Sequence, residues 1–233
     1  MNKKQHSGKI CVAIAAKSTA KAINLAKKAE PYADVIEIRL DALTTPEIKP
    51  FTEALATPLL FTNRATWEGG SFSGSEEERL DLLYQAIDTG ASFIDIELKT
   101  DASLQGKLLK KAHKRNIQTI VSWHNFSSTP SQQALRSILQ DQYKTGAKIG
   151  KIITMANSPY DVLRVLNLLV EAYEIGFPLI AFCMGVSGVV SRIATTELGG
   201  YMTYAAADST TGTAPGQLEI SSLKTIQKLM HGS

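Results

Sequence analysis

The sequence predicts an α/β protein with a single domain folded as a (β/α)8 barrel, the TIM barrel. Eight short apolar runs rich in β-forming residues alternate with stretches whose apolar residues recur at helical spacing. Eight such units fit the 233 residues of the chain, which is close to the length typical of this barrel. An open doubly wound sheet would normally carry a nucleotide-binding fingerprint. No G-x-G-x-x-G follows the first predicted strand, and no G-K-[ST] occurs in the chain.

Apolar periodicity and the residues that end each run define the predicted elements. Short runs of β-branched and aromatic residues predict strands at 10–15, 35–41, 59–64, 93–98, 118–124, 149–155, 179–185 and 202–207. Apolar residues three or four apart predict helices at 19–33, 50–56, 76–89, 103–115, 131–145, 158–175, 187–198 and 220–230. Ser75 and Glu78 have the spacing of a capping box at the start of the third helix. Gly90, Gly146 and Gly176 lie where helices should end.

The ends and the composition of the chain predict a cytoplasmic protein that binds neither nucleic acid nor membranes. Residues 1–9 are predicted to be a flexible N-terminal tail and residues 10–233 the catalytic barrel, because the basic tail lacks the apolar core of a signal segment. The net charge of +3 is small and evenly spread, and no apolar stretch reaches the roughly 18 residues of a membrane span. Cys11 and Cys183 lie in predicted strands, which indicates buried thiols.

Charged residues interrupt the second predicted strand on one face only. Alternation places Glu37 and Arg39 on one face and the isoleucines beside them on the other. Because the apolar face must contact the helices, we expect the charged face to point into the barrel near its carboxyl end. A structural ion pair is the alternative, but buried ion pairs are costly, so a functional role is favoured.

Further charged residues follow the third and seventh predicted strands. Arg64 ends the third strand, Glu68 follows it in a glycine-rich loop, and Arg192 comes shortly after the seventh strand. Each arginine alone could lie on the surface. The three arginines together (Arg39, Arg64 and Arg192) predict a site for an anionic ligand. Guanidinium groups bind carboxylates and phosphates through paired N–H donors.

His124 and Lys151 lie on neighbouring predicted strands, His124 at the end of one and Lys151 near the start of the next. His124 ends the fifth strand, where an imidazole can serve as a general acid and base, although a structural histidine is the alternative. Lys151 lies on the sixth strand and could extend out of the strand end into solvent. If it points inward, burial and the nearby arginines are expected to disfavour its charged form. A free amine beside a histidine can form an imine with a carbonyl, so the pair predicts a carbonyl substrate that bears an anionic group.

Seven short motifs in order along the chain resemble those of the type I 3-dehydroquinate dehydratases. They are Glu37-Ile38-Arg39-Leu40-Asp41, Phe61-Thr62-Asn63-Arg64 with Glu68-Gly69-Gly70, Ile94-Asp95-Ile96-Glu97-Leu98, Ser122-Trp123-His124-Asn125-Phe126, Gly150-Lys151-Ile152, Met184-Gly185 through Ser191-Arg192, and Thr213-Ala214-Pro215-Gly216-Gln217. Each motif alone is weak evidence. Seven in register over nearly the whole chain are specific.

The resemblance implies dehydration of 3-dehydroquinate to 3-dehydroshikimate, a step of the shikimate pathway, with no metal and no cofactor. It implies that Lys151 forms the Schiff base, that His124 transfers protons and that Glu68 orients His124. It further implies that Arg192 binds the substrate carboxylate, and that the hydroxyls and ring are held by Glu37, Arg39, Arg64, Thr213 and Gln217. Family likeness also implies a homodimer.

Three positions depart from the family pattern. Asn125 stands where Asp is usual, Thr213 replaces Ser, and Ala13 stands where the first strand often supplies a Ser hydroxyl. Two other functions stay open on the residues alone. One is a class I aldolase acting on a phosphosugar, with a phosphate site near Gly185 and Gly188. The other is a barrel that binds its ligand without catalysis, although loss of Lys151 or His124 would then be expected.

Overall fold

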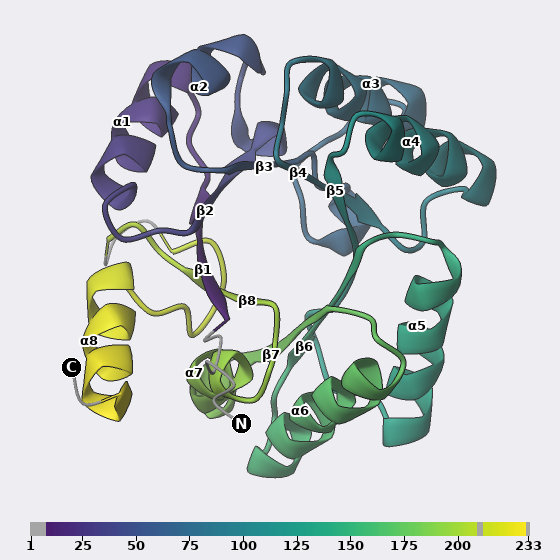
Figure 1. The fold of residues 1–233 in the computed structure, drawn as a ribbon, viewed down its shortest axis with the longest axis vertical. Coiled ribbons are helices and arrows are strands. Elements are labelled where there is room, and N and C mark those ends of the chain that lie inside the picture. The colour runs from purple at the N-terminus through teal and green to yellow at the C-terminus, as the bar shows by residue number, and fades with distance from the viewer. Residues whose placement is uncertain (1–7, 209–211, 232–233) are drawn as a thin grey trace, which may run out of the picture.

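A computed structural model describes residues 8–208 and 212–231, which form alternating strands and helices (Figure 1). The strands are β1 (Lys9–Ile14), β2 (Val35–Arg39), β3 (Leu59–Thr62), β4 (Phe93–Glu97), β5 (Gln118–Asn125), β6 (Ile149–Met155), β7 (Leu179–Met184) and β8 (Met202–Ala205). The α-helices are α1 (Thr19–Ala29), α2 (Lys49–Ala54), α3 (Glu76–Asp88), α4 (Ala102–Lys114), α5 (Gln132–Lys144), α6 (Pro159–Glu174), α7 (Val189–Glu197) and α8 (Ile220–His231). Short 3-10 turns follow β2, β3 and β7: η1 (Leu40–Ala42), η2 (Thr66–Glu68) and η3 (Val186–Gly188).

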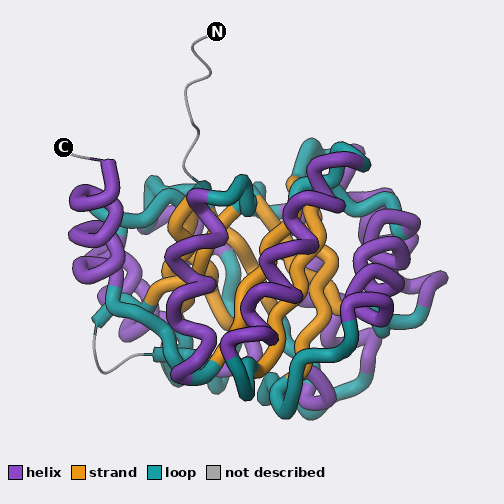
Figure 2. The backbone as a smooth tube through the Cα atoms, turned by 90° about the horizontal axis from the view of Figure 1, so that it is seen from below, coloured by secondary structure: helices purple, strands orange, loops and turns teal. Residues whose placement is uncertain are grey.

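The predicted barrel is confirmed. All neighbouring strands pair in parallel, in the order β7-β6-β5-β4-β3-β2-β1-β8. The two ends of this sheet meet where the Tyr201 N–H donates to the Leu179 carbonyl at 2.8 Å. Viewed along the barrel axis, the helices surround the ring of strands (Figure 1), and from the side they enclose it (Figure 2).

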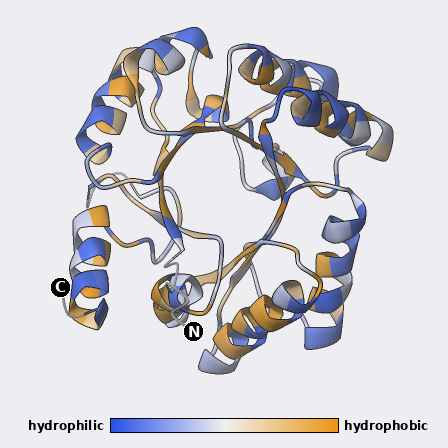
Figure 3. Cartoon of the chain, in the orientation of Figure 1, coloured by the Kyte–Doolittle hydropathy of each residue, from blue (hydrophilic) through white to orange (hydrophobic). Residues whose placement is uncertain are grey.

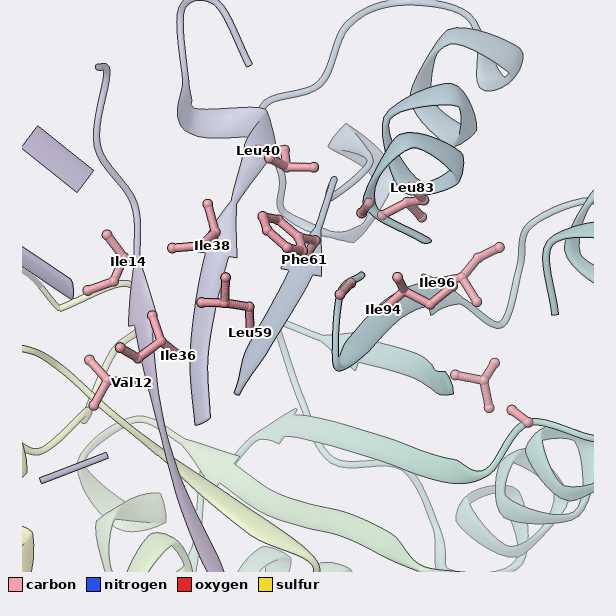
Figure 4. Packing of buried hydrophobic residues seen from close by; sticks show 14 of the residues in the cluster. Val12, Ile14, Ile36, Ile38, Leu40, Leu59, Phe61, Leu83, Ile94 and Ile96 are labelled. Carbon is pink, nitrogen blue, oxygen red and sulfur yellow. The ribbon is translucent and has the colours of Figure 1, made fainter. Parts of the chain in front are cut away.

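Alternation along each strand produces two separate apolar cores. Side chains that point outward, such as Val12, Ile36, Phe61 and Ile94, pack against the helices (Figure 4). The helices turn their apolar residues to the strands and their polar residues outward (Figure 3). A smaller inner core fills the barrel with inward-facing residues: Cys11, Ala13, Val35, Leu60, Phe93, Ile120, Ile149, Ile180 and Met202. These residues form a packed apolar floor. The inward-facing polar residues therefore lie near the carboxyl ends of the strands, where barrel enzymes have their active sites.

The helix boundaries predicted from local signals agree best where those signals are specific. Ser75 and Glu78 form the predicted capping box at the start of α3. Gly90, Gly146 and Gly176 have φ angles of 91°, 76° and 67°, in the left-handed region that glycine adopts readily. Helices α3, α5 and α6 therefore end close to their predicted positions.

Several predicted segments were too long. The strand predicted at 35–41 ends at Arg39, because the chain turns into η1 there. The helix predicted at 19–33 ends at Ala29, since the segment after it turns so that the Asp34 carboxylate accepts a bond from the Ile10 N–H at 2.8 Å. The predicted tail is also too long at its inner end. Lys9 belongs to β1 and the Gly8 N–H donates to the Thr196 carbonyl at 3.1 Å, while residues 1–7 lie outside the described residues.

None of the helices in the described part of the chain combines the length and the apolar character that crossing a membrane requires.

Candidate active site

One cavity at the carboxyl ends of the strands brings together every residue that the sequence predicted for the site. Its lining includes all nine: Glu37, Arg39, Arg64, Glu68, His124, Lys151, Arg192, Thr213 and Gln217. Strands β2, β5 and β6 supply four of them, the segment after β3 supplies two, α7 supplies one, and the segment between β8 and α8 supplies two. Apolar side chains complete the wall, among them Phe126, Phe182 and Met184.

Lys151 points into the barrel and is only 4% exposed. Its Nζ lies 3.0 Å from Asp95 Oδ2, 3.1 Å from Tyr204 Oη and 3.7 Å from Glu37 Oε1. The alternative in which this lysine extends into solvent is therefore wrong. Two carboxylates therefore lie near this nitrogen, which the sequence argument did not consider. A neutral amine in the free protein stays a prediction.

His124 and Glu68 form a hydrogen-bonded pair beside Lys151. The Nδ1 of His124 lies 2.9 Å from Glu68 Oε2, and the imidazole stacks on the Phe126 ring with centroids 5.9 Å apart. Burial, followed by the positive charges of Arg64 and Lys151, holds the pKa of His124 well below its usual value. His124 is therefore a neutral imidazole at physiological pH, with Glu68 fixing one ring nitrogen and the other left for a reacting proton.

The carboxyl group of Glu68 is itself perturbed. Burial raises its pKa to about 8, the carboxylates of Glu97 and Asp95 act in the same direction, and the charge of Arg64 opposes them. Its Oε1 is buried with no hydrogen-bond partner. Near neutral pH the proton of this pair therefore lies mainly on Glu68, hydrogen-bonded to the neutral imidazole of His124. Such a pair can take a proton from a ligand or return one.

Arg64 lies at the centre of a buried ionic network. Its guanidinium contacts Asp95 Oδ1 at 2.9 Å, Glu97 Oε1 at 3.0 Å and Ser122 Oγ at 2.6 Å. Burial opposes its charge, but Asp95 and Glu97 together raise the pKa of Arg64 above its usual value. From α3, Arg79 binds the other oxygen of Glu97. Arg64 is therefore held by protein carboxylates on this side of the cavity.

Arg39 forms an ion pair that the sequence argument did not predict. Its Nε and Nη2 donate to the two carboxylate oxygens of Asp41, at 2.9 and 2.7 Å. Asp41 also accepts bonds from the backbone N–H groups of Arg64 and Ser71, at 3.2 and 3.0 Å. Glu37 instead accepts a bond from the Thr62 hydroxyl at 2.8 Å. The considered Glu37–Arg39 pair is thus replaced by Arg39–Asp41, which fastens the segment after β3.

Arg192 differs from the other two arginines, because no carboxylate among the described residues pairs with it. It is 1% exposed, and among the described residues its Nη2 donates only to the Pro215 carbonyl, at 3.2 Å, while its Nε has no partner there. The guanidinium lies 4.7 Å from the centroid of the Phe182 ring. Burial lowers the pKa of Arg192 to about 10. A buried cation without a carboxylate partner that lines a cavity has the chemistry to bind an anion.

Thr213 and Gln217 close the cavity from the segment before α8. The backbone N–H and the hydroxyl of Thr213 both donate to Gln217 Oε1, at 2.7 and 3.1 Å. The Gly185 N–H donates to the Pro215 carbonyl at 3.2 Å, which ties this segment to the end of β7. Within the described part of the chain, no bond is formed by the Gln217 amide nitrogen and none is accepted by the Thr213 hydroxyl oxygen, so both can contact a polar ligand.

Two residues at the lysine were missing from the predicted site, Asp95 and Tyr204. Asp95 binds Lys151, Arg64 and Ser122, and although burial would raise its pKa, the charges of Arg64 and Lys151 lower it below its usual value. Alternation could have found Asp95, because it faces inward on β4 as Glu37 does on β2. Tyr204 follows the same rule on β8, but a buried tyrosine is ordinary in a core and gave no signal.

Two of the departures from the family pattern have a clear structural place. Asn125 Oδ1 accepts bonds from the Ser127 N–H, the Ser127 hydroxyl and the Ser128 N–H, at 3.0, 2.9 and 3.0 Å. It therefore fixes the turn after β5, as Asn and Asp commonly do. Ala13 belongs to the apolar floor of the barrel and adds no polar group to the cavity.

The fold and the site together define a barrel enzyme that acts on a small molecule. Solved structures of similar proteins, given below, have the same barrel. The polar groups of the site converge at the carboxyl ends of the strands, where barrel enzymes bind their substrates. The model of the family described as Type I 3-dehydroquinase matches residues 10–233. The chain belongs to the type I 3-dehydroquinase family.

Relatives and solved structures agree with this assignment. A 3-dehydroquinate dehydratase of Desulfotalea psychrophila is 48% identical over 221 residues, covering 95% of this chain and 97% of the relative. A type I 3-dehydroquinate dehydratase from Clostridium difficile, with covalent modified comenic acid, matches with a TM-score of 0.88 and 31% identity, covering 97% of this chain and 93% of its own. The 3-dehydroquinate dehydratase from Geobacillus kaustophilus matches with a TM-score of 0.90 and 25% identity, covering 97% and 91%.

Proposed function

We propose that this chain dehydrates 3-dehydroquinate to 3-dehydroshikimate, as a hydro-lyase of the shikimate pathway, through a Schiff base on Lys151. The observation that carries the proposal is the joint placement of three groups in one cavity. These are a buried lysine amine, a hydrogen-bonded His124–Glu68 pair, and an Arg192 guanidinium that no carboxylate of the described residues contacts. They match a substrate with a ketone, an acidic C–H beside it and a carboxylate.

The first stage is formation of the imine. The Lys151 amine attacks the C3 carbonyl carbon. The nitrogen then gives up one proton and the carbonyl oxygen takes one, which gives a neutral carbinolamine. The carbinolamine hydroxyl takes a second proton and leaves as water, so that a protonated imine remains. We assign these proton transfers to His124, because its ring is neutral and Glu68 holds one nitrogen while the other faces the cavity.

The second stage is elimination. The protonated imine withdraws electrons from the adjacent C2–H bond, so a base can remove that proton and leave an enamine. The enamine electrons then expel the hydroxyl on the next carbon, which takes a proton and leaves as water. Hydrolysis of the product imine returns the free lysine. The protons balance over the cycle, and no cofactor or metal is proposed.

The remaining site residues are proposed to bind the substrate. Arg192 would pair with the carboxylate, which removes the cost of its uncompensated charge. Glu37, Arg39, Thr213 and Gln217 would contact the hydroxyls, since each presents a polar atom to the cavity. The predicted substrate-binding role of Arg64 is proposed in a narrower form. One edge of its guanidinium would contact the ligand while Asp95 and Glu97 hold the other.

An absorbance assay tests the activity directly. The purified chain mixed with 3-dehydroquinate should produce the absorbance of the conjugated enone of 3-dehydroshikimate. Lys151→Met keeps a side chain of similar length at this position but removes the amine. This variant should turn over substrate only at the background rate. Normal turnover by this variant would rule out the imine mechanism. No enone from the native chain would rule out the activity.

We also propose that the chain forms a homodimer in the cytoplasm. Both cysteines are buried free thiols, which fits a reducing compartment. Four large apolar side chains on α6 are 56–79% exposed: Tyr160, Leu163, Val170 and Tyr173. The two tyrosines are equidistant from the midpoint of this stretch, and so are Leu163 and Val170. A two-fold axis at that midpoint would pair each residue with its apolar counterpart, as a symmetric interface requires.

The mass in solution tests the dimer. Light scattering should give twice the 25.3 kDa of one chain. Leu163→Glu should give a monomer, because it places a charge at the centre of the proposed interface. A carboxylate placed elsewhere on the surface by Lys107→Glu, on α4, should leave the dimer intact. A monomeric native chain, or a dimer that tolerates Leu163→Glu, would contradict this interface.

A further inference from the structure

Tyr204 touches the reacting atom of the proposed mechanism, and no step described above uses it. Its hydroxyl lies 3.1 Å from Lys151 Nζ, and Nζ is 4.3 Å from the centroid of its ring. The ring is fixed from below and from the side, because it belongs to the inner core and lies 6.0 Å from the ring of Phe182. The hydroxyl therefore has a defined position relative to the lysine.

We infer that Tyr204 is a further catalytic residue, whose hydroxyl orients the Lys151 amine for attack on the substrate carbonyl. The inference rests on the proposed Schiff-base function. Its physical basis is the number of hydrogen bonds that nitrogen can donate at each stage. A neutral amine has two N–H donors and one lone pair.

Two fixed acceptors lie within hydrogen-bond distance of this nitrogen. Asp95 Oδ2 is at 3.0 Å and Tyr204 Oη is at 3.1 Å, while the next oxygen, Glu37 Oε1, is at 3.7 Å. When both N–H groups of the amine donate to the two near oxygens, its lone pair occupies the remaining direction. Lys151 lines the cavity, and on this inference a bound carbonyl carbon approaches along that direction. Fixing the attack geometry in advance accelerates bond formation.

The contact with Tyr204 is specific to one part of the reaction. A protonated imine nitrogen carries a single N–H, so it can donate to only one of the two acceptors. Asp95 is the stronger partner for that cation because it is a carboxylate. Tyr204 therefore loses its bond when the imine forms and regains it when the imine is hydrolysed. Its hydroxyl should affect formation of the adduct and leave the elimination step unchanged.

The surroundings of Tyr204 keep its hydroxyl protonated. Burial raises the pKa of Tyr204 well above its usual value, and the charges of Glu37 and Asp95 act in the same direction. The phenol therefore does not act as a base that removes the C2 proton. It remains a neutral group that accepts a hydrogen bond from the lysine.

Single-turnover trapping of Tyr204→Phe tests the inference. This change removes one oxygen and keeps the ring that packs in the barrel. Rapid mixing with 3-dehydroquinate, reduction with borohydride at successive times and mass analysis would report two rates. The first is the appearance of any adduct, and the second is the loss of one water from the adduct. We expect adduct formation to slow about 10-fold to 100-fold, with dehydration of the adduct and the melting temperature unchanged.

Tyr201→Phe is the matched control. Tyr201 lies just before β8, is half-buried, packs its ring against Phe93 and makes no hydrogen bond through its hydroxyl in the described structure. It should form the adduct at the native rate. Native-rate formation by Tyr204→Phe would overturn the inference, and so would an equal slowing of both steps, which indicates a general disturbance. A native chain that forms no adduct would instead overturn the proposed function.

Discussion

The two sides of the cavity treat buried positive charge in opposite ways. On the side formed by β2 to β5, Arg64 contacts Asp95 and Glu97, and Arg39 contacts Asp41. On the side formed by β7 and α7, Arg192 contacts a carbonyl oxygen and the face of an aromatic ring. The pKa values follow this difference. That of Arg64 is raised by its carboxylate partners, whereas burial lowers that of Arg192 to about 10.

This difference separates the arginines with a structural role, Arg39 and Arg64, from Arg192, which is proposed to bind the ligand. A guanidinium with its own carboxylates fixes the positions of the side chains around it and gains little from an added anion. A buried guanidinium without a carboxylate is unfavourable in the empty protein, and an anionic ligand compensates it. The comparison predicts different results when each arginine is replaced by an apolar residue of similar length.

Replacing the paired arginine should have the largest effect on stability. Arg64→Met leaves the carboxylates of Asp95 and Glu97 buried without their main partner. Breaking a buried pair in this way costs about 3–5 kcal/mol in the free energy of unfolding, which denaturant titration measures. Arg136→Met is the control, because Arg136 pairs with Glu171 at the surface and should cost less than about 1 kcal/mol. Equal costs would contradict the structural role of Arg64.

The raised pKa of Glu68 gives a pH-dependent prediction. The pKa of Glu68 is about 8 in the folded protein and 4.5 as its ordinary value. The folded state therefore holds the carboxyl proton more tightly than the unfolded state, and its contribution to stability is lost as pH rises from 4.5 through 8. Glu68→Gln cannot ionise, so it should gain stability over the native chain across that range. The gain should reach roughly 2–4 kcal/mol at pH 9.

Thermal unfolding at several pH values measures this gain. The melting temperatures of the native chain and Glu68→Gln should be close at pH 5 and should separate up to about pH 9. Glu77→Gln, on the exposed part of α3, serves as a control for loss of one carboxylate. A constant difference between native and Glu68→Gln at all pH values would show that the carboxyl group is not perturbed.

Replacing the unpaired arginine should weaken binding and spare the fold. Arg192→Met removes an uncompensated buried charge, so the empty protein should be as stable as the native chain or more stable. The KM for 3-dehydroquinate should rise about 10-fold to 100-fold, which corresponds to a charge-assisted hydrogen bond of roughly 1.5–3 kcal/mol. Arg192→Lys keeps a positive charge without the paired N–H donors, so its KM should lie between those of the native chain and Arg192→Met. An unchanged KM would place the carboxylate elsewhere.

The sequence predicted the barrel because each strand and helix is encoded locally. Alternation also predicted which face of β2 points inward, and so it brought Glu37 and Arg39 to the cavity. The pairing of charges could not be predicted in the same way, because it depends on distances between strands. Asp41 was assigned to a strand, yet η1 turns it toward Arg39. The free state of Arg192 and the contact between Tyr204 and Lys151 likewise depend on elements far apart in the chain.

The central claim of this account is a covalent bond between Lys151 and the substrate. Borohydride reduction of the native chain in the presence of 3-dehydroquinate, followed by peptide mass mapping, measures it most directly. The account predicts one added ligand mass, on the peptide that contains Lys151. The account is contradicted if the enzymatically active chain gains no ligand mass after reduction, or if the added mass lies on a different lysine.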